Sequence, residues 1–127
     1  MAEMTFEHVQ ERSRRLANAL SSLGLKRGDR VAILLPQCPE TLLAHLAAYR
    51  LGAIALPLFT LFGPEAIEYR LNDSGAKIVV SNATGIEKLV GIAESLAAPP
   101  ILISIDERRE DHVLEWDKLI DAASADH

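Results

Sequence analysis

The stretch of sequence that decides the fold runs from residue 31 to residue 80, VAILLPQCPETLLAHLAAYRLGAIALPLFTLFGPEAIEYRLNDSGAKIVV. It contains three short apolar runs, at residues 31–35, 54–58 and 78–80, and each is continuous rather than alternating. Such runs are typical of strands in a parallel sheet that helices cover on both faces. Each segment between them is long enough for one helix, so the stretch predicts two right-handed βαβ units.

The flanking sequence predicts further helices and one more strand. An amphipathic helix within residues 1–24 begins at Thr5, a favoured N-cap residue, and ends at Gly24. A helix at about residues 84–97 and a strand at 101–105 follow the third apolar run. We therefore expect an α/β fold of three layers, in which a mostly parallel sheet of about four strands carries helices on both faces.

Two features of this core predict how its elements are placed. Pro57 lies inside the second apolar run, and because proline cannot donate a ladder hydrogen bond, it favours an edge strand or a ragged strand end. The helix expected at residues 39–51 is apolar on nearly all sides. A sheet would cover only one of those sides, so we expect this helix to have a packing partner beyond this chain.

The chain is long enough for one domain, and we expect a single α/β domain over residues 1–127. Its parts are the amphipathic helix within 1–24, a βαβ-type core over 30–106, and a charged loop with a short terminal helix over 107–127. Trp116 is expected to dock that terminal helix on the core.

Composition excludes several functional classes. The net charge is −5 with both signs interspersed, which argues against a nucleic-acid partner. The single cysteine, Cys38, excludes an internal disulfide and fits a reducing compartment, so we expect a cytoplasmic protein without a membrane span. The four histidines are scattered without ligand spacing, so no metal site is predicted. The common nucleotide-binding and hydrolase motifs are absent, and no catalytic residue is predicted.

One loop is the candidate binding site. Thr60, Leu61, Phe62 and Gly63 lie between the second apolar run and Pro64, which favours the start of a helix. Open α/β sheets bind ligands at the carboxyl ends of their strands, and helix N-termini attract anions. The alternative is an ordinary connection in which Phe59 and Phe62 fill the core.

Two long strings resemble a known family. GLKRGDRVAILLPQCPE at residues 24–40 and AYRLGAIALPLFTLFGPEAIEYRLNDSGAKIVV at 48–80 are similar to the N-terminal subdomain of the AMP-forming acyl-CoA synthetases. The resemblance extends over residues 5–121 and is specific because several spaced features recur in order. It implies an acid–thiol ligase that uses ATP, Mg²⁺ and coenzyme A to make acyl-CoA through an acyl-adenylate.

The resemblance also implies where this chain would contribute. In such synthetases the loop at residues 60–63 often carries two small residues facing the coenzyme A nucleotide, whereas here Thr60 and Leu61 occupy those positions. Some relatives place a basic residue for the coenzyme's phosphates near position 87, where this chain offers Lys88. The family's Ser/Thr/Gly-rich phosphate loop and its C-terminal lysine have no counterpart in these residues. We therefore expect the chain alone to be inactive, with none of the cofactors bound tightly.

The expected partners are the remaining subdomains of the parent ligase and a carboxylic acid substrate, short-chain, medium-chain or aromatic. Apolar surface near residues 42–51 and at the sheet edges also predicts a homodimer. Two alternatives remain open at this point. One is a stand-alone α/β module for protein interaction or small-ligand binding without catalysis. The other is an adenylation domain that loads a carrier protein.

Overall fold

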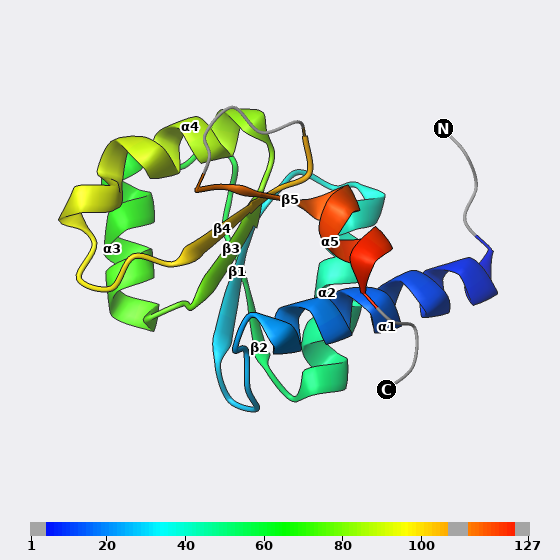
Figure 1. The fold of residues 1–127 in the computed structure, drawn as a ribbon. Helices are drawn as coiled ribbons and strands as arrows, with labels where there is room; N and C mark the ends of the chain where they lie inside the picture. The colour runs from blue at the N-terminus through cyan, green and yellow to red at the C-terminus, as the bar shows by residue number, and fades with distance from the viewer. Residues whose placement is uncertain (1–4, 107–111, 124–127) are drawn as a thin grey trace.

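The protein folds as a five-stranded parallel sheet with helices on both faces (Figure 1). A computed structural model describes residues 5–106 and 112–123. The strand order is β2-β1-β3-β4-β5, and every neighbouring pair is parallel. The strands are β1 (Arg30–Leu34), β2 (Ile54–Pro57), β3 (Ile78–Ser81), β4 (Ile101–Ser104) and β5 (Leu114–Glu115). The helices are α1 (Phe6–Ser22), α2 (Pro39–Leu51), α3 (Pro64–Ser74), α4 (Ala83–Ile92) with a 3₁₀ turn η1 (Ala93–Ser95), and α5 (Trp116–Ala122).

The two faces of the sheet bury separate groups of side chains, because successive strand residues point to opposite faces. On one face, Ile33 and Ile103 pack with α1, α2 and α5. On the other, Leu34 and Leu102 pack with α3 and α4. Figure 1 shows the two helical layers on either side of the sheet. The expected three-layer α/β fold is confirmed.

Helix α1 begins and ends where the sequence predicts. The Thr5 hydroxyl accepts a hydrogen bond from the His8 amide at 3.1 Å. The helix closes at Leu23, and Gly24 follows with φ +100°, a conformation that favours glycine. Leu20 is fully buried, but Phe6 in the first turn is 76% exposed, so the apolar pattern extends beyond the covered part of the helix.

Helix α2 finds its second packing partner within this chain. Cys38 is its N-cap residue, Pro39 occupies its first turn, and Gly52 closes it in the left-handed conformation. Leu43 and Ala47 are buried in the cluster that α1 and the sheet share, whereas Leu42 is 51% exposed. Helix α1 thus covers a side that we expected a partner beyond the chain to cover.

The strand count differs slightly from the expectation of about four, because residues 114 and 115 add a fifth strand to β4. Two residues are too few to show the alternating pattern of a strand, and the apolar residues around them have the spacing of a helix. The helix expected at 84–97 ends instead at Ile92 and continues as the turn η1. Trp116 is 2% exposed at the start of α5, which confirms its docking role.

Pro57 ends β2, which among the described residues pairs with β1 alone and lies at one edge of the sheet, as its sequence position indicated. Most of the charged loop that the sequence predicts, residues 107–111, lies outside the described residues. No helix of the described part of the chain has the length and apolar character needed to cross a bilayer.

Candidate functional site

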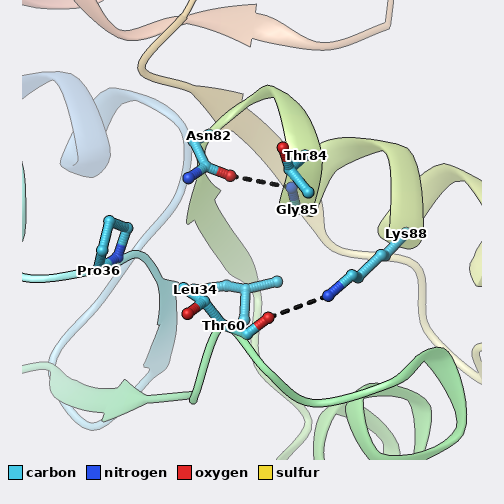
Figure 2. Close-up of a pocket in the computed structure, with 7 residues that line it drawn as sticks. All are labelled: Leu34, Pro36, Thr60, Asn82, Thr84, Gly85 and Lys88. Carbon is cyan, nitrogen blue, oxygen red and sulfur yellow. Dashed lines mark hydrogen bonds between the residues drawn. The ribbon is translucent and has the colours of Figure 1, made fainter.

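The site lies at the carboxyl edge of the sheet, where all the parallel strands end. In the last paired row, Leu34 of β1 lies beside Ser81 of β3, and Ser81 lies beside Ser104 of β4. A pocket of about 270 Å³ opens above this row (Figure 2). It is lined by Leu34, Pro36, Thr60, Asn82, Thr84, Gly85 and Lys88. Three chain segments therefore converge on it, the ends of β1 and β2 and the first two turns of α4.

A glycine brings α4 close to the sheet at the base of the pocket. The buried Ser81 hydroxyl donates to the Leu34 carbonyl oxygen at 2.8 Å. A Cβ atom on Gly85 would overlap that hydroxyl and would lie 3.1 Å from the Leu34 side chain. Only a residue without a side chain fits here, so Gly85 sets the distance between α4 and the sheet.

Two backbone amides at the start of α4 already have partners from the chain itself. The Asn82 side-chain oxygen accepts from the Gly85 amide at 2.9 Å. The Asp106 carboxylate accepts from the Ala83 amide at 2.8 Å. Because these oxygens occupy the helix N-terminus, an anion in the pocket would gain little from those amides.

Lys88 supplies the positive charge of the pocket. Its ammonium donates to the Thr60 carbonyl oxygen at 3.0 Å and to the Phe62 carbonyl oxygen at 3.2 Å. Figure 2 shows this side chain extending from α4 toward Thr60 across the pocket. An ammonium group has three protons to donate, so one remains for a ligand.

The loop before α3 presents apolar side chains at the surface. Phe59 is 73% exposed and Leu61 is 95% exposed, so Phe59 does not fill the core. The Phe62 ring meets the Phe59 ring edge-on at 5.3 Å between centroids, and the Arg70 guanidinium lies 4.8 Å from the centre of the Phe62 ring. The side chain of Phe62 also packs in part against the α3 and α4 side of the core.

The four residues predicted from the sequence therefore have different environments. Thr60 lines the pocket, Leu61 points to solvent, Phe62 packs beside it, and Gly63 is the N-cap residue of α3. Sequence reasoning missed Asn82, Thr84 and Gly85. Asn82 had a usable signal, since an asparagine directly after a buried strand is a favoured helix cap. Within residues 5–106 and 112–123, no group of three or more His, Cys, Asp or Glu side chains is arranged to hold a metal ion.

A scan against protein families matches residues 2–126 to the AMP-binding enzyme model. The chain belongs to the AMP-binding enzyme family. Its similarity to named members is consistent with this assignment. An acetyl-coenzyme A synthetase of Rhodobacter capsulatus is 46% identical over 81 residues, which cover 64% of this chain and 12% of that protein.

Solved structures of CoA-dependent synthetases and ligases share this fold over nearly the whole chain. The crystal structure of a Brucella canis acyl-CoA synthetase is 39% identical, with a TM-score of 0.88 over 99% of this chain and 23% of that one. An anthranilate CoA ligase in complex with anthranoyl-AMP is 26% identical, with a TM-score of 0.95 over 99% of this chain and 24% of that one. The chain thus spans less than a quarter of the length of each of these members of the AMP-binding family.

Proposed function

We propose that this chain is the N-terminal subdomain of an ATP-dependent, AMP-forming carboxylic acid–CoA ligase. The observation that carries the proposal is the match of residues 2–126 to the AMP-binding family, together with solved acyl-CoA and aryl-CoA ligases that share the fold. The remaining subdomains of the ligase would be its partners. A short-chain, medium-chain or aromatic carboxylic acid would be the substrate of the whole enzyme.

Within this ligase, the pocket at the carboxyl edge would contact coenzyme A. The Lys88 ammonium suits a phosphate group, and Thr60 and Thr84 add hydroxyl groups beside it. Pockets for drug-sized ligands usually hold about 300–1,000 Å³. The volume here is about 270 Å³, so this chain would hold one phosphorylated part of the coenzyme while other subdomains hold the rest.

ATP and Mg²⁺ would be held outside this chain. The described residues offer neither a cluster of metal ligands nor a cation beyond Lys88 in the pocket. Adenylation requires charge neutralisation at the adenylyl group that is transferred and at the pyrophosphate that leaves, and the described part of the pocket does not supply it. The chain would therefore support the fold and coenzyme contact without performing adenylation.

Two assays test this function. The longer ligase should show carboxylate-dependent ATP–pyrophosphate exchange and should release AMP when coenzyme A is added. The 127-residue chain alone should show neither activity, and measurable exchange by it would overturn the assignment of adenylation to other subdomains. Failure of the longer protein to exchange pyrophosphate with any short, medium-chain or aromatic acid would overturn the ligase proposal itself.

Coenzyme A is favoured over a carrier protein as the acceptor, because the related proteins named above are CoA synthetases and ligases. Release of free acyl-CoA by the longer enzyme tests this choice. The homodimer expected from the sequence, through residues 42–51 and the sheet edges, stays a prediction; Leu42 and Tyr49 of α2 and Ile54 of the edge strand β2 are exposed there. Light scattering at high concentration tests it, and a monodisperse monomer would count against it.

A further inference from the structure

Lys88 joins α4 to a loop that lies well before it in the sequence. It projects from the second turn of α4 and binds carbonyl oxygens 28 and 26 residues earlier in the sequence, at Thr60 and Phe62. Both carbonyls belong to the segment of residues 59–63, which we call the β2–α3 loop. One charged side chain thus binds two carbonyl groups of this loop.

The β2–α3 loop has few other anchors. Its Phe59 and Leu61 side chains are mostly in solvent, so they add little apolar stabilisation. Within the loop, the Phe62 amide donates to the Phe59 carbonyl oxygen at 3.0 Å. Near the end of the loop, the Arg70 guanidinium lies over the Phe62 ring. The Phe62 side chain packs in part against the core, but the rest of the loop has little burial, so the two bonds from Lys88 add to what orders it.

The same ammonium faces the pocket at the carboxyl edge. Lys88 and Thr60 both line that pocket, together with Thr84 and Asn82 (Figure 2). Two protons of the ammonium are used by the loop carbonyls, and the third can reach an anion in the pocket. The anion and the loop therefore do not compete for the same donor.

We propose that Lys88 is a positioning residue that couples anion binding in the carboxyl-edge pocket to the order of the β2–α3 loop. An anion beside the ammonium removes water from it and restricts its motion, which strengthens its bonds to Thr60 and Phe62. Because coupling between two sites is reciprocal, an ordered loop raises anion affinity by the same factor. The identification of the anion as a phosphate of coenzyme A rests on the function proposed above, whereas the hold on the loop does not.

Hydrogen exchange of loop amides in the 127-residue chain tests the hold on the loop. Lys88→Met keeps the aliphatic stem and removes the donors, so the Phe62 amide should exchange about tenfold faster or more. The Leu89 amide in α4 should change little. Lys88→Arg restores a charged donor. It should reverse at least half of the change in the logarithm of the Phe62 exchange rate. Lys118→Met, at an exposed position on α5, is the matched control and should leave the loop unchanged.

Unchanged exchange at Phe62 in Lys88→Met would overturn the proposal. If Lys88→Met does not fold, Lys88→Arg decides instead, since loop exchange there should stay within about threefold of the wild-type rate. A larger increase in the folded Lys88→Arg variant would also overturn it.

Anion titrations test the coupling. Inorganic phosphate and coenzyme A, added separately, should each slow exchange at Phe62 in the wild type and should have no effect on it in Lys88→Met. Anion binding without any change in loop exchange would overturn the coupling. Slower exchange with phosphate but no response to coenzyme A would support the coupling and would overturn the proposed coenzyme contact, so the two failures are distinguishable.

Discussion

The two faces of the sheet are closed by different means. On the face covered by α1, α2 and α5, branched and aromatic side chains such as Leu20 and Trp116 fill the space between layers. On the face covered by α3 and α4, Gly85 brings a helix against the strands, and the Ser81 hydroxyl bonds across to the Leu34 carbonyl. The first face is held by apolar volume, and the second combines apolar packing with close backbone approach.

The difference follows from where the pocket lies. Polar groups and the start of α4 lie beside the strand ends there, and bulky side chains in their place would close the pocket. Small and polar residues therefore replace apolar volume at the end of the second face. Substitutions at Leu20, Gly85 and Ser81 test this contrast, with expected effects that fall in that order.

Leu20→Ala tests the apolar face. Leu20 is fully buried, and removing its side chain leaves a cavity in a close-packed region, which should cost about 2–5 kcal/mol of unfolding free energy. Leu61→Ala removes the same atoms from a side chain that is 95% exposed, so it should change stability by less than about 0.5 kcal/mol. Urea unfolding measures both, and similar losses would contradict the contrast.

Gly85→Ala tests the close approach of α4. The added Cβ meets the Ser81 hydroxyl and the Leu34 side chain, so overpacking should cost about 2 kcal/mol despite the better helix propensity of alanine. Gly91→Ala in the same helix meets nothing within 4 Å and should stabilise by about 0.5 kcal/mol. Stabilisation of Gly85→Ala as well as Gly91→Ala would show that helix propensity, and not the contact, decides.

Ser81→Ala tests whether the hydroxyl is the atom that Gly85 must avoid. Loss of its hydrogen bond to Leu34 should cost about 1 kcal/mol. The double variant Ser81→Ala with Gly85→Ala should be more stable than the sum of the single changes predicts, by about 1 kcal/mol. Additive effects in urea unfolding would shift the cause of strain to the remaining contacts with Leu34.

The pH dependence of Asp29 should have the smallest effect, and it lies at the opposite end of the sheet from the pocket. The hydrogen bond from Lys77, at 2.9 Å, and the Lys26 amide hold the pKa of the Asp29 carboxyl below its usual range. A lowered pKa means that this stabilisation is present above the ordinary carboxyl range and is lost as pH falls through the folded-state pKa. Comparing urea midpoints of the wild type and Asp29→Asn from pH 7 to pH 2.5 should show a smaller decline in the variant, and parallel declines would exclude this contribution.

The sequence could predict the elements of the core because its signals are local. Pro39 and Pro64 mark two helix starts, Gly24 and Gly52 follow two helix ends, and the strands are continuous apolar runs. The two residues of β5 could not be predicted, because their pairing depends on β4 and not on any period of their own.

The site could be predicted only in part. The position of Thr60 after a parallel strand was enough to place it near the carboxyl edge. The Ala83 amide donates a hydrogen bond to Asp106, 23 residues away in the sequence. The hydrogen bonds that Lys88 donates depend on the direction in which α4 leaves β3. Such contacts follow from the packing of helices on the sheet, and spacing along one chain does not reveal them.

Pro57 has a consequence for how β2 meets other molecules while the chain folds. The Ile54 amide donates to the carbonyl oxygen of Asp29, just before β1, and the Leu58 amide donates to that of Ile33 in β1. By alternation, Ala55 and Pro57 turn their backbone groups away from β1. Since proline has no N–H, the outer side of β2 offers a single donor, that of Ala55. A strand from another molecule would find one backbone N–H donor along this edge. Edge-to-edge pairing, which leads to aggregation during folding, is therefore disfavoured at β2.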